Sequence, residues 1–256
     1  MPMNKILIFI VAIILIVGGL FGIAYFAQKG SSQQQPATAT TTTAGPGYTI
    51  TTLDDGTFTE PAPSLDNPVR YSDAIPAAAR TVIQKHIDED VAKIKADKTN
   101  AGAWLDLGLW YHSAEDYQAA AAVWEFLTKV APKDTTALNN LGRLYHFDLK
   151  DFPKSEQYFL RSMKIAPKSM DPYIELFQLY SLSYKKDTSA AVDIMHTAEA
   201  QFPNDSGLPF ALGAYYRDRG QFVLARAEFE KGVSIARTQG NLGQVAAINA
   251  ELAKLP

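Results

Sequence analysis

Apolar residues recur at helical spacing through most of the chain after residue 76. In the stretch 76–96 the pattern predicts one amphipathic helix, begun by Pro76 in its first turn. Its apolar positions are Ala79, Val82, Ile83, Ile87, Val91 and Ile94. A second helix is predicted over 241–255, with Val245, Ile248, Leu252 and Leu255 on one side and polar residues on the other. We expect the first helix to pack on the N-terminal end of the intervening region and the second to cap its C-terminal end.

One pattern occurs four times in the intervening region. Its most complete copy reads Trp104-x-x-Leu107-Gly108-x-x-Tyr111, followed by Ala120, Trp124 and Pro132. The tyrosines that align the copies are 34, 35 and 36 residues apart; they are Tyr111, Tyr145, Tyr180 and Tyr216. The additional residues fall near 148–150 and 185–187, where we expect turns between helices. A period of this length predicts helix pairs that stack and bury their apolar faces on one another.

This block resembles the tetratricopeptide repeat (TPR) family over about 101–237. The resemblance implies an all-α fold: a right-handed α-solenoid of about four helix pairs with capping helices. The implied repeats are 101–134, 135–169, 170–205 and 206–239. The sequence departs from the family pattern at Phe177, where a small residue is favoured, and at Arg237, where a proline is usual. These departures bear on local packing in the third and fourth repeats.

Small and large residues have separate expected roles in each repeat. Gly108 and Gly142 let the two helices of a pair approach closely. Trp124, Phe159 and Phe229 are expected to fill the space between repeats.

The resemblance also implies a binding surface, because the first helices of such repeats line a concave groove that holds peptides or folded partners. Carried over by position, the groove residues are Leu105, Leu109, His112, Asn139, Arg143, His146, Ile174, Gln178, Ser181, Phe210, Ala214 and Arg217. The open alternative is a solvated inner face, or a groove filled by the protein's own tail.

A clamp for an acidic chain terminus, found in chaperone-binding members of the family, is not expected here. Asn140 matches one asparagine of such a clamp. Leu105, Leu109, Asp171 and Glu175 occupy positions where lysine, asparagine or arginine would be needed.

The N-terminal region predicts a membrane anchor. After a short tail of residues 1–5, Ile6–Phe26 is an uncharged apolar run, long enough at about 1.5 Å per residue to span a bilayer. We assign a transmembrane helix to 6–27; a cleaved signal peptide fits less well because its apolar core is usually shorter. Gly18 and Gly22 form a small-residue pair that could bring two such helices together. The basic flank at Lys5 favours a cytoplasmic N-terminus and an extracytoplasmic repeat domain.

Two segments connect the anchor to the helices. Residues 28–47 have low complexity and are expected to form a flexible linker. Residues 48–75 predict an extended segment, with a β-hairpin in Tyr48–Glu60 around the turn signal Asp55-Gly56.

The composition of the chain excludes several classes of function. The chain has no cysteine and a formal net charge of −3, which excludes thiol chemistry and argues against nucleic-acid binding. No phosphate loop, zinc-protease or serine-hydrolase motif is present. His112 and His146 would lie about 10 Å apart in successive repeats, too far apart to share one metal ion. We therefore expect no enzyme activity, no cofactor and no metal.

Three functional hypotheses follow. The first is a membrane-anchored adaptor or scaffold that binds a protein or peptide partner in its groove. The second is a self-associating structural scaffold of the cell envelope, in which the partner is another copy. The third is a non-catalytic accessory subunit of a membrane enzyme complex.

Overall fold

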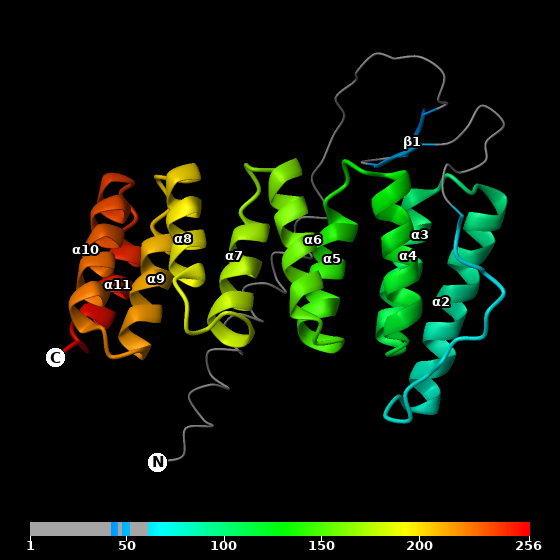
Figure 1. The fold of residues 1–256 in the computed structure, drawn as a ribbon, viewed down its shortest axis with the longest axis horizontal. Helices are drawn as coiled ribbons and strands as arrows, with labels where there is room; N and C mark the ends of the chain where they lie inside the picture. Colours follow the sequence, from blue (N-terminus) through cyan, green and yellow to red (C-terminus); the bar gives the residue numbers. More distant parts are fainter. Residues whose placement is uncertain (1–41, 46–47, 52–60) are drawn as a thin grey trace.

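The computed structural model describes residues 42–45, 48–51 and 61–256. Within these residues it contains ten α-helices that follow one another in a row (Figure 1). They are α2 (Ala77–Ala96), α3 (Ala101–Ser113), α4 (Tyr117–Val130), α5 (Thr136–Arg143), α6 (Phe152–Ile165), α7 (Asp171–Gln178), α8 (Ala190–Gln201), α9 (Gly207–Asp218), α10 (Phe222–Thr238) and α11 (Leu242–Leu252). The predicted all-α helical repeat fold is confirmed.

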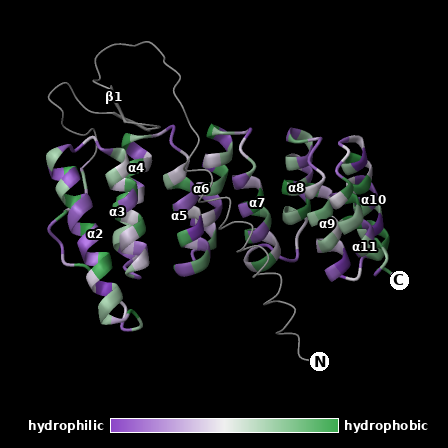
Figure 2. Cartoon of the chain, turned by 180° about the vertical axis from the view of Figure 1, so that it is seen from behind, coloured by the Kyte–Doolittle hydropathy of each residue, from purple (hydrophilic) through white to green (hydrophobic). Residues whose placement is uncertain are grey.

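Each repeat is a pair of antiparallel helices. The pairs are α3 with α4, α5 with α6, α7 with α8, and α9 with α10, and each helix also contacts the next one along the chain. Figure 2 shows hydrophobic and hydrophilic positions alternating around the helices, as expected when every helix buries some sides and leaves others in water. Side-chain caps begin four of the helices: Asn100, Asp116, Asp151 and Asn241 each accept a hydrogen bond from the backbone N–H three residues on.

Glycine and an aromatic ring meet inside three of the four pairs. A Cβ on Gly108, Gly142 or Gly213 would come within 2.2, 2.4 or 2.6 Å of Trp124, Phe159 or Phe229, respectively. The glycines therefore allow close helix approach, as predicted. The aromatic residues were expected to fill the space between repeats, but they pack on the glycine of their own repeat. The buried apolar residues form two clusters, one from α2 to Tyr145 and the other from α6 to α11.

The third repeat forms the contact between its two helices with different residues. Phe177 occupies the position of the glycine, and Met195, fully buried, stands where the other repeats have an aromatic ring. A large residue on the first helix is thus matched with an unbranched, adaptable side chain on the second. Phe177, which departs from the family pattern, therefore places the large side chain on the first helix instead of the second, and the two helices still pair.

Two first helices end in π-helical turns that the sequence did not predict. These are η1 (Leu144–Asp148) after α5 and η2 (Leu179–Ser183) after α7. The first coincides with an inserted residue: Tyr145 precedes the N-cap Asp151 by six positions, whereas Tyr111 precedes Asp116 by five. A wider helical turn absorbs an additional residue while the following helix keeps its place.

An extended segment covers the N-terminal end of the row. Residues 61–75 run beside α2, with an ion pair of 2.8 Å between Lys95 Nζ and Asp66 Oδ1. Ser72 N–H then donates to the carbonyl of Ala114, at the turn between α3 and α4. Apolar side chains of this segment pack on the first core cluster; they are Leu65, Val69, Tyr71 and Ile75. The segment takes the place that a first helix would occupy before α2.

The strand pairing differs from the prediction. Strand β1 (Thr42–Gly45) pairs antiparallel with β2 (Tyr48–Thr51), and Gly45 lies opposite Tyr48. The hairpin thus begins inside the stretch assigned to the linker, and β2 contacts α3 and α4. Asp55 and Gly56, the predicted turn, lie outside the described residues.

The predicted transmembrane helix also lies outside the described residues. Among the helices that the structure does describe, none combines the length and the apolar character needed to cross a bilayer.

Candidate functional site

The first helices of the repeats present one continuous set of side chains, which we call the first-helix face. It consists of the outward-facing residues of α3, α5 with η1, α7 with η2, and α9. Leu109 is 39% exposed and the Arg143 side chain is 50% exposed. The other predicted groove residues that reach this surface are half-buried: His112, Asn139, Ile174, Gln178, Ser181, Phe210, Ala214 and Arg217.

Two predicted groove residues are buried, so their assignment to an open lining is wrong. Leu105 is 2% exposed because it belongs to the first core cluster, where its carbonyl accepts a hydrogen bond from Trp124 Nε1. His146 is 1% exposed because its ring stacks on Phe147 and its Nε2 lies 2.8 Å from Ser183 Oγ. Burial lowers the pKa of His146 to about 4, with a smaller contribution from the charge of Lys150.

Polar contacts link the first helices of neighbouring repeats. His112 Nε2 lies 3.0 Å from Asp148 Oδ2, and Arg143 Nε donates to Glu175 Oε1 at 2.6 Å. Arg217 pairs with Glu251 on α11. The predicted groove residues do not include Asp148, Glu175 or Ser183, so sequence reasoning missed these contacts.

The pair of Arg143 and Glu175 is the most constrained polar feature of this face. Burial raises the pKa of the Glu175 carboxyl, and the adjacent Arg143 guanidinium partly offsets the shift. Among the described residues, Glu175 Oε2 and Asn139 Oδ1 are buried with no hydrogen-bond partner. The Arg143 side chain is 50% exposed, so its guanidinium can also meet a planar acceptor such as a carboxylate.

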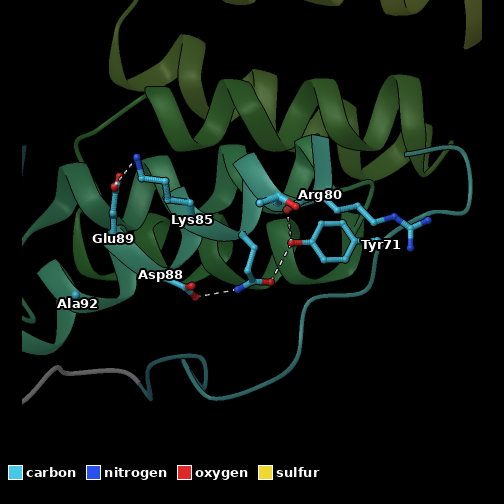
Figure 3. Close-up of a pocket in the computed structure, with 8 residues that line it drawn as sticks. Tyr71, Arg80, Lys85, Asp88, Glu89 and Ala92 are labelled. Atoms are coloured by element: carbon cyan, nitrogen blue, oxygen red, sulfur yellow. Dashed lines mark hydrogen bonds and ion pairs between the residues drawn. The ribbon is translucent and has the colours of Figure 1, made fainter. Parts of the chain in front are cut away.

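Two cavities on the described residues lie away from the first-helix face. One open hollow of about 780 Å³ lies along α2, between Tyr71 and charged side chains that pair with one another (Figure 3). There the Tyr71 hydroxyl donates to Gln84 Oε1 at 2.9 Å, and Lys85 pairs with Glu89 at 3.7 Å. A smaller cavity of about 320 Å³ lies between α8 and α10, where Lys231 Nζ meets Glu199 Oε2 at 2.7 Å. In both cavities, charged side chains of the lining are paired with one another.

Within the part of the chain that the structure describes, no group of three or more histidine or acidic side chains is placed to hold a metal ion.

Sequence comparison identifies the repeats. Residues 105–169 match the family model described as "Tetratricopeptide repeat". This stretch of the chain carries tetratricopeptide repeats. Proteins built from such repeats are typically non-catalytic scaffolds and protein-interaction modules. No curated protein sequence matches the chain at a significant level.

Several solved structures are similar to this one at low sequence identity. The structure titled "Crystal structure of MamA protein" is 17% identical with a TM-score of 0.50, over 64% of this chain and 87% of that one. A tetratricopeptide repeat protein from Parabacteroides merdae is 16% identical with a TM-score of 0.45, over 70% and 74% of the two chains. YrrB, titled "a TPR protein with an unusual peptide-binding site", is 13% identical with a TM-score of 0.44, over 62% and 88%. At these identities the likeness concerns the fold alone.

Proposed function

We propose that this chain is a membrane-anchored adaptor whose first-helix face binds an extended segment of a partner protein. The observation that carries the proposal is Arg143: its guanidinium is held at Nε by Glu175, while the side chain stays half exposed. An arginine fixed at one nitrogen is oriented for recognition and loses little further freedom when a partner binds. An acidic side chain of the partner is the group that fits it.

Apolar side chains support the same surface. Leu109 lies exposed on α3, the first helix of the preceding repeat, and Ile174 and Phe210 are half-buried on α7 and α9. Exposed apolar groups beside one oriented charge are typical of the anchors of a protein interface.

The membrane part of the proposal rests on the sequence. The run Ile6–Phe26 has the length and apolar character of a bilayer span, and Lys5 favours a cytoplasmic N-terminus. Because the chain has no cysteine, a Leu242→Cys variant carries a unique thiol at a side chain that is 75% exposed. A membrane-impermeant maleimide should label it in intact cells. Labelling only after lysis would contradict the extracytoplasmic assignment.

Site-specific photo-cross-linking tests the binding face. A benzophenone amino acid is placed at Leu109 on the first-helix face, or at Leu160 on α6, in the full chain in native membranes. These two leucines are 39% and 40% exposed, so they form a matched pair. We expect position 109 to give one defined cross-linked adduct, and the yield of that adduct to fall in the Arg143→Glu variant. Position 160 should not give the same adduct. Equal adducts at both positions, or an adduct insensitive to Arg143→Glu, would argue against this face. An adduct with a second copy of the chain would favour the self-associating scaffold.

A further inference from the structure

Exposed apolar side chains gather along one edge of the repeat row. The described residues include nine large apolar side chains that are exposed, and five of them adjoin the turns between the first and second helices of repeats two to four. These five are Phe147, Leu182, Phe222, Val223 and Leu224, with exposed fractions of 45, 52, 40, 84 and 47%. We call this set, with its neighbouring basic residues, the turn edge.

The turn edge is one continuous strip because the helices alternate in direction. Every turn from a first to a second helix therefore falls on the same side of the row, the lower side in Figure 1. Contacts tie the neighbouring turns together: His146 Nε2 lies 2.8 Å from Ser183 Oγ, and Arg219 Nη2 donates to the carbonyl of Ser181 at 3.3 Å. The apolar residues of three repeats are thus held side by side.

A basic residue lies three positions from an apolar residue in each of the three turns. Lys150 follows Phe147 by three residues, and Lys185 follows Leu182 by three. In the fourth repeat, Arg219 precedes Phe222 by three. Lysine and arginine can keep their charge in the headgroup layer while apolar neighbours enter the acyl boundary, so this pairing is typical of a membrane-contacting surface.

The acidic residues of this edge are mostly engaged within the protein. Asp148 contacts His112, Asp218 pairs with Arg217, and Asp151 caps α6. The exposed Asp187 offsets one lysine, Lys186. Lys185 is also engaged, with Glu156 at 2.5 Å, whereas Lys150 is exposed three residues after Phe147. An exposed lysine next to engaged carboxylates favours a negatively charged surface as the counterpart.

We propose that the turn edge of repeats two to four lies on an anionic lipid surface, with the first-helix face turned to the side. This inference rests on the membrane anchor of the proposed function, which holds the repeats near a bilayer. The residues 28–41, between the anchor and the hairpin of β1 and β2, number 14, a reach of up to about 50 Å when extended. A 14-residue helix such as α6 is only about 21 Å long. Either edge of the row can therefore reach the bilayer, and the distribution of apolar and basic residues selects the turn edge.

Depth measurement on single-cysteine variants tests the proposal. Val223→Cys is on the turn edge, and Leu242→Cys, at the start of α11, is at the opposite side; these positions are 84% and 75% exposed. Each full-length variant is labelled with an environment-sensitive fluorophore and reconstituted in vesicles of phosphatidylcholine, alone or mixed with phosphatidylglycerol. Flotation of the vesicles first shows whether the chain is anchored. For each variant we then measure how strongly the fluorophore is quenched by aqueous iodide and by lipids brominated in the acyl chain.

With phosphatidylglycerol present, we expect the label at 223 to be about threefold less accessible to iodide than the label at 242, and to be quenched by the brominated lipid. The substitutions Phe147→Ser and Leu182→Ser should abolish that difference while the helical circular dichroism signal is retained. Equal iodide access at 223 and 242 in vesicles that carry the chain would overturn the edge proposal alone. Protection at 223 without quenching by brominated lipid would assign the edge to a protein contact, and would overturn it as well. Failure of the chain to float would overturn both the anchor and the edge.

Discussion

The space next to Gly108 is filled by the indole of Trp124. A Cβ at residue 108 would lie 2.2 Å from Trp124 Nε1, and that nitrogen donates to the carbonyl of Leu105 at 3.2 Å. The ring is therefore fixed by a hydrogen bond at the point where α3 and α4 come closest. The indole cannot move away without giving up that bond.

Gly108→Ala is expected to destabilise the domain by about 1–3 kcal/mol, because the added methyl group overpacks a fixed ring. Gly102→Ala in the same helix is the control. Its Cβ would meet its nearest neighbour, Asn100 Oδ1, at an ordinary 3.5 Å, and alanine is the better helix former by roughly 0.5–1 kcal/mol. Urea unfolding of both variants measures the difference. A Gly108→Ala protein as stable as the unsubstituted chain would refute the close packing described here.

Much of the fold can be predicted from the sequence because the same residue pattern occurs four times. The glycine and tyrosine positions establish which helices pair, and the predicted small-residue contacts at Gly108 and Gly142 are present. Burial within the first-helix face was less predictable. Leu105 and His146 share a helical face with exposed neighbours, but core packing and the π-turn at Leu144–Asp148 place them inside. A π-turn changes the phase of the helix and leaves no residue signature comparable to a proline or a glycine.

The partners of the candidate site were also hard to predict. Arg143 and Glu175 are 32 residues apart and lie on different helices, so only the stacking geometry brings them together. One sequence signal was available: the position five residues before each aligning tyrosine holds Asp106, Asn140 and Glu175 in the first three repeats. A polar residue at one repeated position of successive first helices indicates a contact along the row.

Backbone conformation at equivalent turns gives a second stability prediction. Glu115 and Gly220 both lie four residues after an aligning tyrosine and both have positive φ, at 60° and 70°. Glu115→Gly should stabilise the domain by about 0.5–1 kcal/mol, and Gly220→Ala should destabilise it by a similar amount, because only glycine adopts this conformation without strain. No heavy atom lies within 4 Å of a Cβ at 220, so packing does not contribute. Melting temperatures that move in the opposite directions would disprove the backbone argument.

The buried His146 predicts an acid-sensitive stability. Its pKa falls from 6.5 to about 4 in the folded protein, so below about pH 6.5 the unfolded chain takes up a proton that the folded chain does not. The stabilisation present above pH 6.5 is therefore lost as the pH falls toward 4, at up to about 1.4 kcal/mol per pH unit. His146→Gln should flatten this part of the stability–pH curve. Chemical denaturation of the variant and of the unsubstituted chain at a series of pH values measures both curves, and identical slopes would contradict the burial of His146.

The pair of Arg143 and Glu175 predicts an asymmetric mutational response. Arg143→Ala should cost about 1–3 kcal/mol at neutral pH, because it leaves a buried carboxylate without its cation. Glu175→Gln should cost less, since burial already raises the pKa of that carboxyl and disfavours its charged form. In the Arg143→Ala variant the pKa of Glu175 rises further, so the stability deficit should shrink as the pH falls. The double variant should recover part of the loss. Additive effects of the two substitutions would show that the side chains do not interact.

Amide hydrogen exchange of the full chain, with and without the partner captured at position 109, tests the binding account most directly. We expect addition of the partner to slow amide exchange in α3, α5 and α7 and to leave the exchange rates of α4, α6 and α8 unchanged. In the Arg143→Glu variant this slowing should be lost. Slowed exchange confined to the second helices, or unaffected by Arg143→Glu, would contradict it.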